Sequence, residues 1–426
     1  MIKKQIRSIL ISFSTLCLIL GVAFLVIAYG RGYRLDLRKN SLKPTGLLSA
    51  TSDPIAAQVY LNGTLRTATN NSINVDPDFY TVKIAKEGFI AWQKTIRVQG
   101  EIVTRADAFL VPTNPSLSPL TTSGIINPVL SPDGTKIAYI VPTRSNSEES
   151  ISNVGMWVLE LADRPLGRNR DPYQVARADG AFDFAKTTIR WSPDSTQLLI
   201  TDGVRVRLYP STKLSAYEDV SKSYEILLKE WKKQKQTKDF QKLDGFKEEI
   251  IKIASSSTKL IAFSPDETKL LYEATASAVL PVVIDPPLIG ANSIEETRTI
   301  TAGKLYIYDS HEDKNYFVLD AKEILTAKPT PPAKKSQSTT QSLSFSLSDD
   351  PLNKLTWFPT NRHLLLGFNG KIDIMEYDRT NWSTIYSGPF VDGFLAPWPN
   401  SSRIVILTNL NPGASTLPNL YTINLR

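Results

Sequence analysis

A tight turn between two apolar runs occurs five times in this 426-residue chain and limits the folds that the chain can adopt. The most complete copy is Leu130-Ser131-Pro132-Asp133-Gly134, followed by the apolar segment 136–140. Proline fixes φ in such a turn, an Asp side chain can bond the backbone two residues on, and Gly tolerates positive φ. Each copy therefore predicts a β-hairpin. The turn prolines are Pro132, Pro193, Pro265, Pro359 and Pro399.

The spacings between these prolines are 61, 72, 94 and 40 residues. The shortest spacing is typical of one four-stranded propeller blade, and the longer ones predict blades with insertions. Three copies keep Ser-Pro-Asp, and the set resembles the Pro-Asp, WD40-like repeats of TolB-like β-propellers. The resemblance implies a mainly β fold, with a β-propeller of about five or six blades over residues 120–426.

The last predicted strand, Leu420–Asn424, lies at the C-terminal end of the sequence. The final blade would then lack its outer strand, and an open sheet edge favours aggregation. We expect a strand from near Leu117–Ile126 to pair there and close the ring.

Residues 219–254 change to helical periodicity and predict a helical hairpin inserted in the propeller. One apolar face includes Val220, Tyr224 and Trp231, and a second includes Leu243 and Ile250. We expect the connection at residues 232–239. The insertion is nearly neutral overall and is expected to cap the propeller rim, the alternative being a partner-binding arm. Residues 276–302 predict a long loop, and residues 327–351, rich in Pro, Lys, Ser and Thr, predict disorder.

Residues 8–29 are nearly all apolar and carry no charge, and they follow Lys3, Lys4 and Arg7. As a helix they would span roughly 33 Å, enough for a bilayer core of about 30 Å. The run is longer than the apolar region of a secretory signal peptide, which is the alternative. We therefore expect a single-pass membrane anchor in residues 1–40, with a cytoplasmic N-terminus and an extracytoplasmic remainder. Basic residues flank both sides, so charge counting does not decide the orientation.

Residues 44–112 predict a compact β unit, in which Asn62-Gly63 suits a type I′ hairpin turn. The unit resembles a PEGA domain through Ser52-Asp53-Pro54, Val59–Gly63, Tyr80-Thr81-Val82 and Lys86-Glu87-Gly88-Phe89. The resemblance implies a small β-sandwich on an envelope or cell-surface protein, without catalysis. Residues 113–119 are expected to form a short, stiff linker to the propeller.

Composition excludes several kinds of site. The single cysteine, Cys17, allows no disulfide within the chain and no cysteine-based zinc site. The net charge of +7 is concentrated in residues 1–40, which carry +6, so we expect no nucleic-acid partner. The two histidines, His311 and His363, are expected to be surface or hydrogen-bonded residues rather than ligands.

The turn residues Asp133, Asp194 and Asp266 could contact a metal or ligand, but capping the turn is the favoured role. Trp191, Trp357 and Trp398 precede the turn prolines and are expected to pack between blades, with sugar stacking as the alternative. We predict no catalytic, cofactor-binding or metal-ligating residue. The sequence thus favours a non-catalytic, membrane-anchored envelope protein whose propeller binds a protein or cell-wall polymer. A propeller enzyme acting on glycans and a purely structural scaffold are the alternatives.

Overall fold

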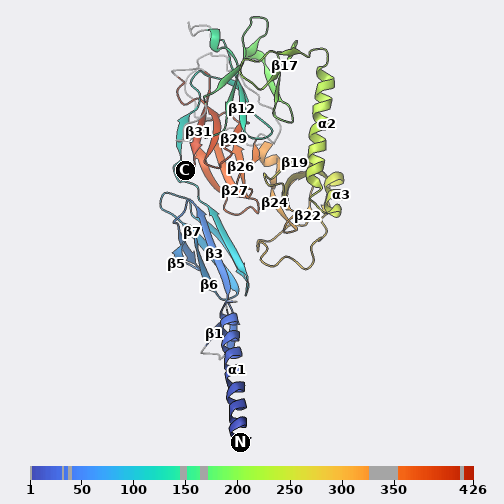
Figure 1. Ribbon diagram of the computed structural model, residues 1–426. Helices are drawn as coiled ribbons and strands as arrows, with labels where there is room; N and C mark the ends of the chain where they lie inside the picture. The colour runs from blue at the N-terminus through green and yellow to red at the C-terminus, as the bar shows by residue number, and fades with distance from the viewer. Residues whose placement is uncertain are drawn as a thin grey trace. The chain divides into compact units, whose positions relative to one another are not determined.

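The computed structural model describes residues 2–30, 33–36, 41–143, 151–163, 171–325, 354–412 and 417–426 (Figure 1). They form two compact units, residues 1–111 with 286–294, and residues 112–285 with 295–426. The predicted disordered segment 327–351 lies outside the described residues.

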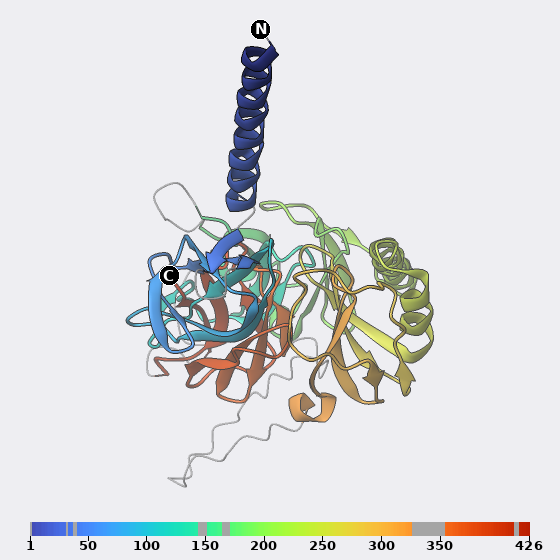
Figure 2. The ribbon, with the colours of Figure 1, turned by 90° about the horizontal axis from the view of Figure 1, so that it is seen from below.

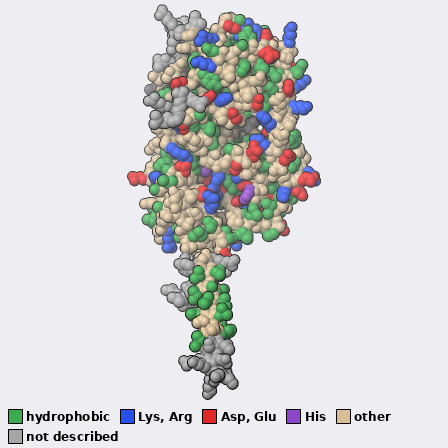
Figure 3. Space-filling view, in the orientation of Figure 1, with side chains coloured by type: hydrophobic (Ala, Val, Ile, Leu, Met, Phe, Trp, Pro, Cys, Tyr) green, Lys and Arg blue, Asp and Glu red, His purple; other side chains and the backbone are tan. Residues whose placement is uncertain are grey.

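The first unit begins with helix α1 (Ile2–Gly30). Its segment Leu10–Ala28 has a mean hydropathy of 2.7 and is long and apolar enough to cross a membrane, which confirms the predicted apolar helix. Exposed hydrophobic side chains predominate on the face of this helix that Figure 3 shows. The short antiparallel pair β1 (Tyr33–Asp36) and β2 (Ser41–Pro44) follows.

A two-sheet sandwich completes the first unit and confirms the predicted small β-sandwich. Burial alternates along its strands, and the inner face includes the buried Leu48, Val59 and Ile84. Asn62 and Gly63 have φ values of 49° and 81°, as the predicted type I′ turn requires. The first sheet has the order β6 (Asn71–Val75), β3 (Gly46–Asp53), β9 (Val103–Phe109). The second has the order β5 (Thr64–Ala68), β4 (Gln58–Leu61), β7 (Asp78–Ala85), β8 (Trp92–Val98).

The second unit is a β-propeller, and its described residues contain five four-stranded antiparallel sheets. The first contains β11 (Ile126–Leu130), β12 (Lys136–Val141), β13 (Gly155–Glu160) and β14 (Tyr173–Arg177). The second contains β15 (Thr188–Trp191), β16 (Gln197–Thr201), β17 (Val206–Pro210) and β18 (Glu218–Asp219). The third contains β19 (Thr258–Phe263), β20 (Lys269–Ala274), β23 (Lys304–Asp309) and β24 (Lys314–Asp320). The blade number of the ring stays a prediction.

The fourth sheet contains β25 (Leu355–Trp357), β26 (His363–Phe368), β27 (Lys371–Glu376) and β28 (Ser383–Ser387). The last has the order β10 (Ser116–Pro119), β31 (Asn419–Asn424), β30 (Arg403–Thr408), β29 (Leu395–Pro397). Two short 3₁₀ helices, η1 (Ile151–Asn153) and η2 (Phe184–Lys186), and helix α4 (Ala321–Leu325) connect or follow these sheets.

The expected outer strand of the last sheet is present as β10. Leu117 pairs with Ile423 in antiparallel register, so the start of the propeller supplies the outer strand of its last sheet. The strand is Ser116–Pro119, which the sequence alone assigns to a linker. Beyond it, Ile125 N–H donates to the Pro418 carbonyl at 2.8 Å, which extends the connection.

Adjacent sheets share apolar cores. Residues of the first and last sheets form one cluster, in which Ile137 and Tyr139 pack with Trp398. The first and second sheets share another cluster that contains Trp191. Trp191 and Trp398 belong to these shared clusters, which confirms their predicted packing between blades, and Trp357 is also buried.

The helical insertion differs from the prediction in its connection. Helix α2 (Tyr224–Leu243) runs through residues 232–239, and the chain turns only before α3 (Glu248–Ser257). The predicted connection was wrong because residues 232–239 are rich in Lys and Gln, which are good helix formers, whereas Gly245 provides the break. Both helices lie at the outer side of the propeller sheets (Figures 1 and 2).

The predicted loop 276–302 is mostly irregular and contains one short antiparallel pair. Strand β21 (Ala278–Val279) pairs with β22 (Thr299–Ile300). Of this loop, residues 286–294 belong to the first compact unit.

Candidate binding groove on the propeller

The five Pro-containing turns share one backbone geometry. In each, the residue two positions after the proline has a φ of 60–70°, and its N–H donates to the carbonyl of the residue before the proline. These left-handed residues are Gly134, Ser195, Glu267, Asn361 and Ser401. The turns therefore place successive hairpins in equivalent positions of the propeller.

The Asp side chains of three turns cap them. Ser192 Oγ donates to Asp194 Oδ1 at 2.5 Å, and Thr196 N–H donates to the same oxygen at 3.2 Å. Asp133 and Asp266 accept the corresponding bonds from Ser131 and Ser264. The structure thus confirms that these Asp residues are turn caps.

Hydrogen bonding sets the protonation state of the caps. The Ser192 hydroxyl, with further bonds from Thr196, lowers the pKa of Asp194 below its usual value. Partial burial raises the pKa of Asp133, but hydrogen bonds from Ser131 and Thr135 outweigh it and the net pKa is lowered. Both carboxylates are therefore ionised at neutral pH.

Replacing Asp194 with Ala is expected to destabilise the folded chain by about 0.5–1 kcal/mol, because an exposed cap loses two modest hydrogen bonds. The lowered pKa means that this stabilisation is complete at neutral pH and is lost as the pH falls from about 4 through the folded pKa. Urea unfolding at pH 7 and pH 3 measures both effects. Asp194→Asn is the control, since it keeps the acceptor and does not titrate; an equal pH response in this variant would contradict the assignment.

A cavity of about 1360 Å³ lies between helix α2 and the turn ends of the first two sheets. Its apolar lining comes from both sides, for example from Leu228 on α2 and Ile189 on β15. We call it the lysine groove. It is lined by Val129, Leu130, Pro132, Asp133, Ile189, Arg190, Trp191, Pro193, Asp194, Ser195, Leu228, Lys229, Trp231, Lys232, Lys235, Lys238, Asp239 and Lys242.

The N-terminal half of α2 is fixed on the second sheet. Trp231 is buried in a cluster with Leu199 and Leu208, and Leu227 and Leu228 pack against the same cluster. The apolar positions recur at helical spacing, so one face of α2 is buried on the sheet. This attachment confirms the expected packing of the insertion on the propeller.

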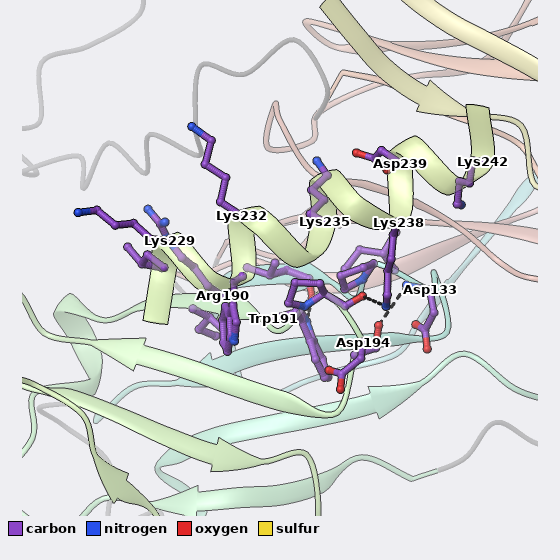
Figure 4. A pocket seen from close by; sticks show the side chains of 18 residues that line it. Asp133, Arg190, Trp191, Asp194, Lys229, Lys232, Lys235, Lys238, Asp239 and Lys242 are labelled. Atoms are coloured by element: carbon purple, nitrogen blue, oxygen red, sulfur yellow. Dashed lines mark hydrogen bonds between the residues drawn. The ribbon is translucent and has the colours of Figure 1, made fainter. Parts of the chain in front are cut away.

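The C-terminal half of α2 is tied to the turns by two lysines. Lys238 Nζ donates to the Pro193 carbonyl at 3.0 Å, and Lys242 Nζ lies 2.9 Å from Glu267 Oε1. Figure 4 shows Lys238 reaching from the helix to the turn that carries Asp194.

Four other cations of the groove form no direct ion pair within the described part of the chain, although Asp239 attracts Lys235. Arg190, Lys229, Lys232 and Lys235 are exposed and make no ion pair there. Lys229, Lys232 and Lys235 recur every three residues on the helix, a spacing at which like charges destabilise a helix by about 0.2–0.5 kcal/mol per pair. In Figure 4 Arg190 extends toward Lys229, while Lys232 and Lys235 extend away from the turns.

The groove also contains the carboxylate of Asp239. Burial raises the pKa of this group, and Lys235 and Lys242 only partly oppose the rise. Asp239 points away from Asp133 and Asp194 (Figure 4). The three carboxylates therefore do not converge on one point.

The floor between the two sheets is held by bonds that cross from one to the other. Trp191 Nε1–H donates to the Val129 carbonyl at 3.1 Å, and Asp133 N–H donates to Ser195 Oγ at 3.2 Å. These bonds fix the positions of the two turns relative to one another. The groove is therefore preformed rather than assembled around a ligand.

The sequence-predicted candidates occupy different places. Asp133, Asp194 and Trp191 line the groove, whereas Asp266 lies in the third turn. His363 is buried with its Nδ1 2.8 Å from Thr360 Oγ1, and His311 is exposed. Among the residues that the structure describes, there is no group of three or more His, Cys, Asp or Glu side chains that could hold a metal. Sequence reasoning missed the lysines, although their spacing of three and four residues from Lys229 to Lys242 was a visible signal.

No curated protein matches the chain. Solved structures similar to it include a putative TolB from Agrobacterium tumefaciens, with 13% identity, coverage of 68% of this chain and 71% of that one, and a TM-score of 0.20. TolB from Acinetobacter baumannii has 14% identity, coverage of 81% and 59%, and a TM-score of 0.21. The Myceliophteria thermophila Cps50 (Swd1) β-propeller domain has 11% identity, coverage of 73% and 99%, and a TM-score of 0.26.

The first unit has a direct family match. Residues 45–114 match the model of the PEGA domain, and the same segment folds as the two-sheet sandwich described above. The predicted resemblance is therefore confirmed. Along the sequence, the chain contains an N-terminal apolar helix, a PEGA domain and a β-propeller.

Proposed function

We propose that this chain is a non-catalytic, membrane-anchored envelope protein whose propeller binds a protein or cell-wall polymer outside the cytoplasm. The observation that carries the binding role is the lysine groove, a cavity lined by four cations that form no direct ion pair among the described residues. A folded protein gains nothing from clustering unpaired like charges, so such a cluster favours a role in recognition. The apolar helix and the PEGA domain support the envelope location.

The arrangement of carboxylates favours binding over glycan hydrolysis. Glycosidases use two carboxyl groups facing one scissile bond, with one of them protonated as the general acid. Asp133 and Asp194 are held ionised in turns, and Asp239 points away from them. The structural-scaffold alternative gives no role to the unpaired cations.

The anchor gives a direct prediction. We expect the full-length chain to sediment with membranes and to resist carbonate washing, because residues 10–28 are uncharged and have a mean hydropathy of 2.7. Deleting residues 1–40 is expected to release the protein into the soluble fraction. Sedimentation followed by immunoblotting measures both; a soluble full-length protein, or a deletion variant that stays membrane-bound, would contradict the anchor.

Orientation is tested by cysteine labelling in a Cys17→Ser background. Val204 is 84% exposed, so Val204→Cys is expected to react with a membrane-impermeant maleimide in intact spheroplasts. Lys3→Cys is expected to react only after the membrane is broken. The reverse pattern would place the propeller in the cytoplasm.

The binding role is tested by chemical crosslinking in intact cells, followed by purification and mass spectrometry. The proposal predicts a specific adduct with a protein or cell-wall polymer that is absent from cells making the chain without residues 120–426. If the same adducts form without the propeller, it is not the binding part.

A further inference from the structure

Building on the proposed binding function, we infer that the lysine groove takes an acidic peptide segment of a partner protein, in which Asp or Glu alternates with apolar residues. The inference rests on the charge of the groove, its apolar lining and the geometry of α2.

Charge selects an anionic ligand. Six cationic and three anionic side chains line the groove. Lys238 and Lys242 are engaged with Pro193 and Glu267, whereas Lys229, Lys232 and Lys235 remain available. Two of the three carboxylates, Asp133 and Asp194, are engaged in their own turns. The unsatisfied charge is therefore positive.

The apolar lining selects a ligand that also carries hydrophobic groups. Leu228 from α2, Leu130 from β11 and the turn residues Pro132 and Pro193 are at least partly exposed and lie beside the cations. Burying apolar side chains against such a surface contributes affinity that a purely anionic chain cannot provide. A phosphate-linked polymer could pair with the lysines but would leave this lining in contact with water.

The spacing of the cations suits an extended peptide. Lys229 and Lys235 are six residues apart, which corresponds to about 9 Å along the helix axis. Acidic side chains at alternate positions of an extended strand lie about 7 Å apart, and the residues between them point to the opposite face. Lysine is a flexible point charge that can match single carboxylates at such distances. One peptide face can thus reach the ammonium groups while the other meets the apolar lining.

The test uses the full-length chain in lipid nanodiscs and a fluorescein-labelled peptide of alternating Glu and Leu, with Phe at one apolar position. We expect saturable binding, measured by fluorescence anisotropy, that weakens as salt is raised. A matched peptide with Gln in place of Glu is expected to bind at least roughly tenfold more weakly, since it keeps the apolar groups and loses the charge. Inorganic polyphosphate is titrated in parallel.

The variant Lys229→Glu/Lys232→Glu/Lys235→Glu is expected to lose affinity for the acidic peptide by roughly tenfold or more. Its control is Lys222→Glu/Lys233→Glu/Lys247→Glu, three exposed lysines of the same insertion that do not line the groove. The control should bind within about twofold of the unmodified chain, because its charge change is equal but lies elsewhere. Both variants are first shown to melt like the unmodified chain.

Equal peptide binding by the groove variant and the unmodified chain would overturn the inference, as would no peptide binding at all. Binding of polyphosphate without binding of the peptide would also overturn it and assign the groove to a phosphate polymer. Failure of this inference can be told apart from failure of the proposed function. If intact-cell crosslinking captures the same partner with the groove variant, binding by the propeller stands and the acidic-peptide site does not.

Discussion

A chain that begins at residue 127 is expected to lose the stability of the whole propeller, whereas one that begins at residue 113 is expected to keep it. Residues 113–126, which only the longer chain contains, include β10 and the segment after it. Leu117 pairs with Ile423, and Leu120 N–H donates to the Leu420 carbonyl at 2.8 Å. Leu420 N–H in turn donates to Thr121 Oγ1 at 2.9 Å. Without them β31 becomes an open edge and the first and last sheets lose their covalent connection.

The expected loss is large because several contributions act together. Each backbone hydrogen bond contributes about 1 kcal/mol. Ile125 is fully buried in the cluster shared by the first and last sheets, and removing a buried aliphatic side chain costs roughly 2–5 kcal/mol. Thermal melting of the chains 113–426 and 127–426, with 113–418 as a truncation from the other end, measures the effect. Equal melting temperatures for the first two would show that β10 does not close the propeller.

The second large effect is expected at Arg298. This side chain lies 3.1 Å from Asp313 Oδ1, 3.0 Å from Glu296 Oε2 and 2.6 Å from the Pro281 carbonyl. Asp313 is 2% exposed, and Tyr308 Oη also donates to it at 2.9 Å. Arg298→Met would leave the Asp313 carboxylate buried without its cation.

Breaking a buried ion pair by removing one partner costs about 3–5 kcal/mol, so we expect a fall of about 3 kcal/mol in the free energy of unfolding. Partial burial raises the pKa of Asp313, but Arg298 and two backbone N–H groups outweigh it and the pKa is lowered. In Arg298→Met we expect this pKa to rise. Urea unfolding of Arg298→Met, Arg298→Lys and Arg298→Met/Asp313→Asn measures the effect, and the double variant should recover part of the loss. If Arg298→Met is as stable as Arg298→Lys, the ion pairs of Arg298 do not stabilise the loop between β20 and β23.

The turns and the closing strand could be predicted because their causes are local. Pro193 and Asp194 are adjacent in sequence and impose the turn by themselves. The pairing of the segment near Leu117 with Leu420–Asn424 could be predicted because an open sheet edge has to be covered.

The connection between the two inserted helices was predicted at the wrong place because apolar periodicity, not the position of a helix breaker, was taken to mark the end of the first helix. Residues 232–239 are polar on every side of α2 but contain the good helix formers Lys and Gln, so the helix continues through them. Gly245 marks the true break.

The Arg298 cluster and the lysine groove could not be predicted, because both depend on tertiary structure. Arg298 meets Pro281 and Asp313 only after the loop between β20 and β23 has folded back. The lysines become a site only when α2 packs over the turns of two sheets, and nothing in the sequence of α2 specifies that neighbour.

Site-specific photo-crosslinking in intact cells tests whether the propeller binds its partner through the lysine groove. A benzophenone amino acid replaces Lys232, which lines the groove, or Lys247, which is exposed on the same insertion and does not line it. Both forms must reach the membrane at equal levels. We predict a light-dependent adduct of increased mass from position 232 and none from position 247. Equal adducts from both positions, or no adduct from position 232, would contradict the claim.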